Sequence, residues 1–155
     1  MSAKPAEGQK IIAVNRKAWH FYEMLENLEA GLSLTGSEVK SLRAGKVSFK
    51  DGYVRFANGE ALLSGVHIAP YENAGYAQHE PERERKLLLH EYEIRTLKAK
   101  VEQKGLTVVP LRLYFKHGRV KLEIGLARGK NVHDRKNALK EKDLDREARR
   151  EMERT

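Results

Sequence analysis

The chain contains no cysteine among its 155 residues. This absence excludes disulfide frameworks, cysteine-based zinc sites and thiol nucleophiles. The longest apolar runs, such as Leu87–Leu89, fall far short of the about 20 residues that a membrane-spanning helix needs. The N-terminal segment also lacks the apolar stretch of roughly 7–15 residues that marks a secretory signal. The sequence therefore predicts a soluble, cytoplasmic protein that contacts no membrane.

Motifs that carry catalysis are also missing. The sequence has no phosphate-binding Gly-rich loop, no nucleophile elbow and no HExxH motif. Its 6 histidines never lie three or four residues apart, the spacing that would place two of them on one helix face. Most carboxylates are interleaved with Lys and Arg, which is typical of a solvated surface rather than of an acid–base pair. We therefore expect a protein that is not an enzyme and that has no catalytic residues, metal or cofactor.

Positive charge is what the chain has in excess. It carries 30 Lys and Arg against 22 Asp and Glu, a net charge of +8. Such an excess on a small domain points first to nucleic acid, although it could also serve solubility alone. The basic residues gather in three places, and groups of this kind bind phosphates. These groups are Lys40 and Arg43; Arg83, Arg85 and Lys86; and Arg128, Lys130, Arg135 and Lys136.

Residues 11–127 have the pattern of antiparallel strands. Asn58-Gly59 predicts a tight hairpin, because both residues tolerate positive φ, and His117-Gly118 predicts a second one. Before the second turn, Leu111, Leu113 and Phe115 alternate with polar or amphipathic residues, so we expect them on one buried face. The segment 60–68 is predicted as one strand. The fold class is mainly β: a small antiparallel OB-type barrel of about six strands with about three short helices.

The helices are expected in three places. Asn15 caps a short helical turn, residues 37–42 form a second helix closed by Gly45, and residues 90–104 form the clearest helix, with Gly105 as its stop. Residues 21–34 fit a helix or a strand, and Gly31 favours the strand. Residues 70–86 are predicted as a long polar loop, whose Tyr71 and Tyr76 are candidates for stacking on unpaired bases.

Three regions follow from this pattern: a flexible N-terminus at 1–9, an OB-type RNA-binding barrel at 10–127 and a basic tail at 128–155. The tail has almost no large apolar residues, so we expect it to be disordered when free. Leu144, Ala148 and Met152 lie four residues apart and form a thin stripe, so the tail is predicted to become helical on a partner.

Five blocks in this order and spacing make the chain resemble the SmpB family, the bacterial SsrA-binding proteins. The blocks are Glu29–Leu32, Gly36–Gly45, Arg85–Leu89, Thr107–Pro110 and Gly129–Lys136. The resemblance implies an OB-type barrel that binds the tRNA-like end of transfer-messenger RNA (SsrA RNA). It implies a monomeric adaptor that enters the A site of stalled 70S ribosomes with elongation factor Tu on the same RNA. Its tail would occupy the empty messenger channel and the decoding centre, in the process called trans-translation.

The resemblance also implies residue roles. Its three RNA contacts fall on Glu29, Leu88 and His90, the last replacing an Asn. Without the resemblance, Glu29 would be a solvated strand residue, Leu88 a core residue and His90 a helix cap. In the tail, His133 would stack in the decoding centre, and the residues Asp134, Arg135 and Lys136 would form the charged motif after it.

Two other functions stay open from the residues alone. One is an RNA-directed enzyme, a nuclease or modifying enzyme on an OB scaffold, and the other is a generic ribosome-associated OB protein. Labelled structured RNA separates the first from an adaptor, because an adaptor shifts the RNA without changing it. A preference for transfer-messenger RNA over ordinary tRNA separates the second.

Overall fold

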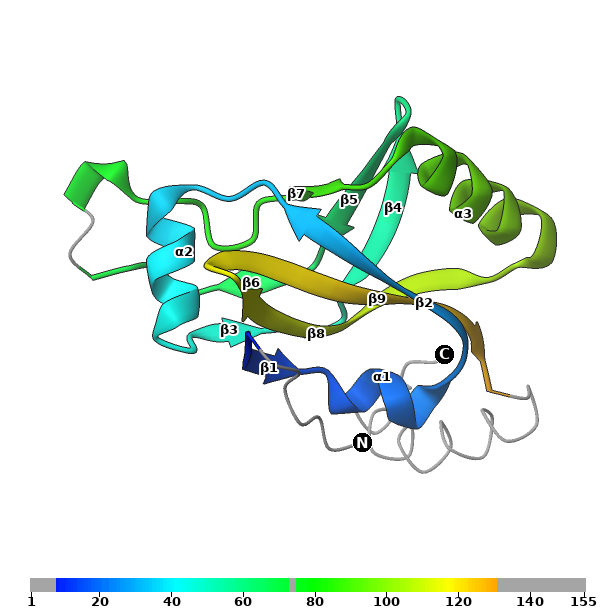
Figure 1. The fold of residues 1–155 in the computed structure, drawn as a ribbon, viewed down its shortest axis with the longest axis horizontal. Coiled ribbons are helices and arrows are strands. Elements are labelled where there is room, and N and C mark those ends of the chain that lie inside the picture. The colour runs from blue at the N-terminus through cyan, green and yellow to red at the C-terminus, as the bar shows by residue number, and fades with distance from the viewer. Residues whose placement is uncertain (1–7, 73–74, 131–155) are drawn as a thin grey trace, which may run out of the picture.

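A computed structural model describes residues 8–72 and 75–130 (Figure 1). Within these ranges the chain is mainly antiparallel β-sheet, with three α-helices and one short 3₁₀ turn. The strands are β1 (Gln9–Val14), β2 (Tyr22–Leu32), β3 (Val47–Ser48), β4 (Tyr53–Ala57), β5 (Glu60–Ser64), β6 (His67–Ile68), β7 (Arg85–Leu88), β8 (Thr107–Lys116) and β9 (Arg119–Gly129). The helices are α1 (Arg16–Phe21), α2 (Gly36–Arg43) and α3 (Glu91–Lys104), and the 3₁₀ turn η1 is Gly75–Ala77.

Six strands pair in a near-closed ring. The order runs β8, β4, β5, β7, β2 and β9, and β9 pairs again with β8. The ring is uneven, because β2 pairs with β9 along most of its length whereas β4 meets β8 only at Val54 and Val108. The core fills the ring with fully buried side chains such as Leu63, Leu122 and Ile124. The prediction of a mainly-β fold with about six strands and three helices is confirmed.

Both predicted hairpins are present. Asn58 and Gly59 have φ of 53° and 76° and join β4 to β5. His117 and Gly118 have φ of 51° and 80° and join β8 to β9. Two central residues with positive φ match the right-handed twist of the flanking strands.

The helix signals are confirmed as well. Asn15 lies at the N-cap of α1, where its side-chain oxygen accepts from the backbone N–H of Ala18 and its amide donates to the carbonyl of Pro110 at 2.8 Å. Thr35 and Glu38 form a capping box at the start of α2. Gly105, in the left-handed conformation, ends α3. The ambiguous segment 21–34 forms mainly strand β2.

Two strand predictions were wrong. Leu111 does not share a face with Leu113 and Phe115, because the register of β8 shifts between Pro110 and Arg112. Leu111 packs instead in a second cluster with Val109 and with Ala18 of α1. The segment 60–68 is not one strand, because a Gly with φ of 79° at position 65 separates β5 from β6.

The predicted loop 70–86 ends in the core rather than in solvent. His79 and Arg85 are buried, and β7 already begins at Arg85. The predictions for residues 1–7 and for the tail from residue 131 onward lie outside the described residues. Among the helices that are described, none has the length and apolar character required to cross a membrane.

Candidate nucleic-acid interface

Three residues that lie far apart in the sequence meet in one open groove. Glu29 comes from β2, Leu88 from the end of β7, and His90 from the residue before α3, and all three line this groove. Lys86 and Lys121 line it as well. We call this groove, between strands β2 and β7, the β2–β7 groove. The sheet register creates it, because Gly31 of β2 lies opposite Leu88 on one side and opposite Lys121 on the other.

Leu88 is an exposed apolar residue within this groove. Its exposed fraction is 54%, whereas that of the preceding Leu87 is 1%. The alternation follows from strand geometry, in which successive side chains point to opposite faces. The reading of Leu88 as a core residue is therefore wrong.

Gly31 leaves room for the side chain of Leu88. A Cβ atom built on Gly31 would lie 3.2 Å from the Cβ of Leu88, closer than side chains usually approach. Glycine is unfavourable in a strand interior, and its presence often marks a close approach. Here the approach is that of the Leu88 side chain, which lies against β2.

Glu29 is a charged acid held by basic and hydroxyl partners. Tyr114 Oη donates to its carboxylate at 2.5 Å, and Lys116 Nζ lies 3.3 Å away. The hydrogen bond from Tyr114 is the largest cause that lowers the pKa of Glu29, and partial burial opposes it. The carboxylate therefore stays ionised and can accept from a base amino group.

His90 combines a helix cap with an exposed ring. Its backbone N–H donates to Glu93 Oε1 at 2.9 Å, so the helix-cap reading holds for the backbone. The imidazole stacks on Tyr92, with ring centroids 5.5 Å apart and an angle of 13° between the planes. Because the cap uses the backbone, the ring can still contact a ligand in the groove.

The chain is similar to known proteins over most of its length. The family model described as "SmpB protein" matches residues 12–154. The chain belongs to the SmpB family. A protein named "SsrA-binding protein" from Solidesulfovibrio magneticus is 67% identical over 154 residues, which are 99% of each chain. Another of that name from Oleidesulfovibrio alaskensis is 60% identical over 98% of each chain.

A solved structure is similar as well. Its title is "tmRNA-SmpB: a journey to the center of the bacterial ribosome". It is 53% identical, with a TM-score of 0.67, and the match covers 82% of this chain and 93% of that one. The resemblance inferred from the five sequence blocks is confirmed.

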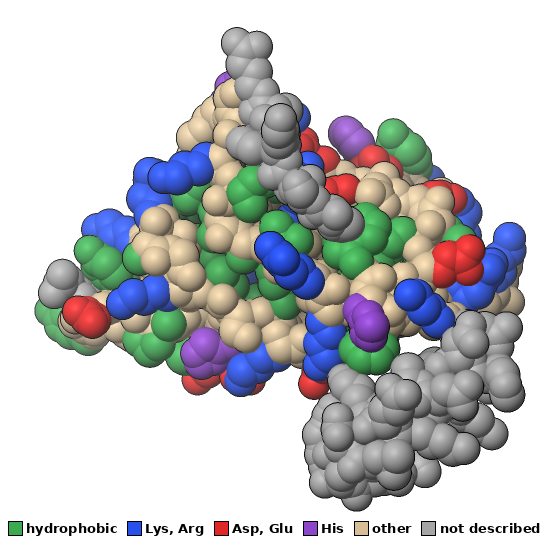
Figure 2. All heavy atoms as spheres, turned by 90° about the horizontal axis from the view of Figure 1, so that it is seen from below, with side chains coloured by type: hydrophobic (Ala, Val, Ile, Leu, Met, Phe, Trp, Pro, Cys, Tyr) green, Lys and Arg blue, Asp and Glu red, His purple; other side chains and the backbone are tan. Residues whose placement is uncertain are grey.

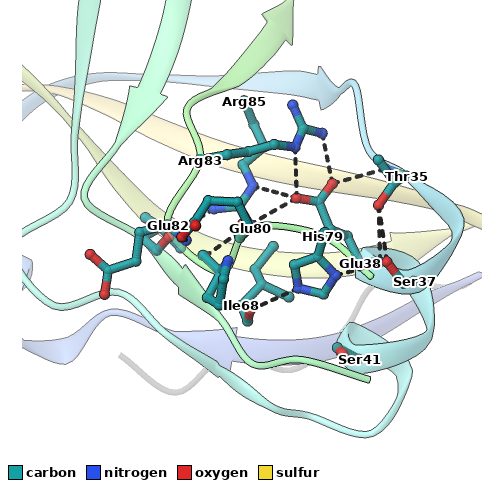
Figure 3. Close-up of polar contacts among 12 residues, drawn as sticks. Thr35, Ser37, Glu38, Ser41, Ile68, His79, Glu80, Glu82, Arg83 and Arg85 are labelled. Carbon is teal, nitrogen blue, oxygen red and sulfur yellow. Dashed lines mark hydrogen bonds and ion pairs between the residues drawn. The ribbon is translucent and has the colours of Figure 1, made fainter. Parts of the chain in front are cut away.

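Arg85 of this SmpB-family chain is buried, whereas its neighbours in the sequence predicted an exposed, phosphate-binding residue. Its side chain is 1% exposed, and its guanidinium is bonded to Glu38 at 2.8 Å and to the backbone carbonyls of Val66 and Pro81 (Figure 3). Each of its three nitrogens donates to a partner inside the protein. The expectation that Arg85 contacts a phosphate is corrected: the residue is structural.

Glu38 is the centre of this buried network. It is fully buried, accepts from Arg83 at 2.7 Å as well as from Arg85, and closes the capping box with the backbone N–H of Thr35 (Figure 3). Burial alone would raise the pKa of Glu38, but these hydrogen bonds outweigh it and lower the pKa. The network ties α2 to β7, the strand that carries Leu88 into the groove.

A second set of bonds holds the loop before β7. The imidazole of buried His79 bonds Ser37 Oγ at 2.8 Å and the carbonyl of Ile68 at 2.9 Å (Figure 3). Ser41 Oγ donates to the carbonyl of Ala69 at 2.7 Å. Nδ1 and Nε2 of His79 are both in use, which fixes the ring against α2. The local sequence gave no signal for this contact, because Ser37 and His79 are 42 positions apart.

The remaining basic residues lie outside the groove or have partners. Lys40 and Arg43 are exposed on α2, over the rings of Tyr71 and Phe115 at 5.6 and 5.0 Å. Figure 1 shows α2 at the opposite end of the sheet from α3.

Other predicted cations have acidic or backbone neighbours. Lys86 lies 3.2 Å from Glu60, and Arg128 lies 3.2 Å from Glu23. The backbone N–H of Lys130 donates to the carbonyl of Phe21. Figure 2 shows basic side chains scattered over the face seen from below rather than gathered in one patch. The tail residues His133, Asp134, Arg135 and Lys136 lie outside the described residues.

Sequence reasoning missed two residues of the groove. The sequence did not single out Lys121, and Gly31 served only to favour a strand over a helix for residues 21–34. The signal for both is the pairing of β2 with β7 and β9, which juxtaposes residues 57 and 90 positions apart. Neither pairing joins strands that a short turn connects, so no local turn signal predicts it.

Proposed function

We propose that this chain is the SsrA RNA-binding adaptor of trans-translation. It binds the tRNA-like end of transfer-messenger RNA and accompanies it, with elongation factor Tu, to the A site of stalled 70S ribosomes. The chain itself carries out no chemistry on the RNA. The proposal includes action as a monomer, in the compartment where ribosomes translate.

One observation carries the proposal. Glu29, Leu88 and His90, the three positions that the family resemblance implies as RNA contacts, line a single groove. An ionised acceptor, an exposed apolar side chain and an exposed ring suit the unpaired, shaped regions of an RNA better than a regular helix. Lys121 and Lys86 add charge that suits the phosphates beside such a contact.

The finer architecture belongs to the same proposal. The six-stranded ring is an OB-type barrel that corresponds to residues 10–127 and holds the RNA. Lys40, Arg43 and Arg83 support binding outside the groove through long-range charge rather than through contact with the groove's ligand. Gln9 already pairs with Lys116 in β1, and β9 continues to Gly129, so the proposed tail begins after this strand.

The tail acts on the ribosome. Arg128, in the last part of β9, and Lys130, directly after it, lead into the tail. His133 with Asp134, Arg135 and Lys136 engages the decoding centre, while the rest occupies the empty messenger channel. The described core is built from residues between Ile12 and Ala127.

In vitro translation on a message that lacks a stop codon tests this function. With SsrA RNA and elongation factor Tu present, the full chain is expected to support tagging of the stalled product. A variant ending at residue 130 is expected to bind the RNA with nearly unchanged affinity and to support no tagging. Full tagging by the shortened variant would contradict the role of the tail, and cleavage or modification of labelled RNA by the pure protein would contradict the role of adaptor.

A further inference from the structure

Two aromatic rings stack in solvent at the start of α3. The rings of His90 and Tyr92 are nearly parallel, at 13°, with centroids 5.5 Å apart. Tyr92 is 60% exposed, so this contact is not part of the core. A ring that stacks by one face and is this exposed keeps its other face open to solvent.

The stacked pair lies at the edge of the β2–β7 groove. His90 lines the groove, and Tyr92 follows it after one residue, in the first turn of α3. Figure 1 shows the start of α3 directly after β7, whose last residue is Leu88. Two large side chains, Leu88 at 54% exposure and Tyr92 at 60%, thus lie exposed within a few residues of each other. Apolar surface concentrated in this way marks a binding site more often than scattered single residues do.

The charges around Tyr92 indicate which part of an RNA would meet it. The first turn of α3 carries Glu91 and Glu93, and both also line the groove. Carboxylates repel a phosphate backbone, so this end of the groove favours the face of a base. The cations that suit phosphates, Lys86 and Lys121, come from strands β7 and β9.

We propose that Tyr92 is a base-stacking residue, which receives one unpaired RNA base on its open face. The inference rests on the proposed function and extends the groove by one residue that the family resemblance did not include. Stacking on His90 holds the Tyr92 ring before the RNA arrives, which lowers the entropy lost on binding. Every base presents a π face, so this contact contributes affinity rather than sequence preference.

The competing explanation is that the two rings only stabilise the start of α3. Binding of the full chain to the tRNA-like domain of SsrA RNA separates the two. Tyr92→Phe keeps the ring and is expected to bind within about twofold of the unchanged chain. Tyr92→Leu keeps apolar bulk without the ring and is expected to lose about 5- to 150-fold in affinity, from the range typical of base–aromatic stacking. The salt dependence of binding should stay the same, because no charge is removed.

The matched control is Tyr53→Leu, which removes an exposed tyrosine from β4 that does not line the β2–β7 groove. It is expected to bind like the unchanged chain. Urea unfolding of each variant shows whether an affinity loss reflects a loss of fold.

A direct readout comes from NMR of ring-labelled tyrosine in the full chain. The resonances of Tyr92, assigned by their absence in Tyr92→Phe, are expected to move upfield when the RNA binds, because a stacked base shields them. Equal affinity of Tyr92→Leu, or a loss of affinity without this shift, would overturn the inference and leave the proposed function standing. Failure of the unchanged chain to bind SsrA RNA would overturn both.

Discussion

Replacing Arg85 by Met is expected to destabilise the fold strongly. The variant keeps the length and apolar stem of the side chain but removes the guanidinium. Among the described residues, Glu38, which is fully buried, then keeps only Arg83 as a charged partner. The carbonyl of Val66 loses the bond from Arg85, and that of Pro81 keeps only the bond from the backbone N–H of Ile68. Breaking a buried ion pair on one side costs about 3–5 kcal/mol of unfolding free energy. For a chain of this size that cost lowers the melting temperature by roughly 6–20 °C.

Urea and thermal unfolding followed by circular dichroism measure this loss. The matched control is Arg95→Met, which breaks the exposed pair with Glu91 and is expected to cost less than about 1 kcal/mol. Adding Glu38→Gln to Arg85→Met removes the unpaired charge and is expected to restore part of the stability.

The same variant decides between a structural and a phosphate-binding Arg85. With the fold kept by low temperature, the slope of log affinity against log salt should not change. An unchanged unfolding midpoint, or a slope reduced by about 0.7–0.9, the share of one phosphate contact, would refute the structural role.

Three further outcomes are expected from the described residues. The pKa of Glu84 is lowered to about 2, chiefly by hydrogen bonds from Arg55, so its stabilising contribution is present above about pH 4.5 and is lost as the pH falls toward 2. Arg55→Ala should therefore flatten the acid side of a plot of urea unfolding midpoint against pH. An unaltered plot would contradict this. Gly31→Val should displace Leu88 and weaken RNA binding while circular dichroism stays the same, so unchanged affinity in a filter-binding assay would refute the role of Gly31. Lys121→Ala should lower the salt slope by about 0.7–0.9, and a constant slope would exclude its phosphate contact.

Local signals in the sequence predict much of this fold. Asn58-Gly59 and His117-Gly118 specify their turns because few residue pairs adopt two successive positive φ values. Asn15 and Gly105 mark a helix start and a helix stop for equally local reasons. The family blocks predict the position of the RNA contacts, and the groove gathers the three that they imply.

The rest depends on contacts between distant parts of the chain. A run of charged residues such as 82–86 is typical of solvent, yet Arg85 is buried, since Glu38 of α2 supplies an opposite charge 47 positions away. The register shift in β8 turns Leu111 away from Leu113, and the alternation of apolar residues in the sequence does not predict this shift. A glycine such as Gly31 is unfavourable within a strand, and only the folded structure shows that the Leu88 side chain lies against it.

Competition between SsrA RNA and ordinary tRNA tests the central claim most directly. The full chain is bound to the labelled tRNA-like domain of SsrA RNA, and unlabelled elongator tRNA or unlabelled SsrA RNA is added at constant salt. Leu88→Ala serves as the groove variant, because it removes apolar contact without removing charge. The account predicts that SsrA RNA competes far better than tRNA and that Leu88→Ala weakens the binding of SsrA RNA. Equal competition by the two RNAs, with no effect of Leu88→Ala, would contradict it.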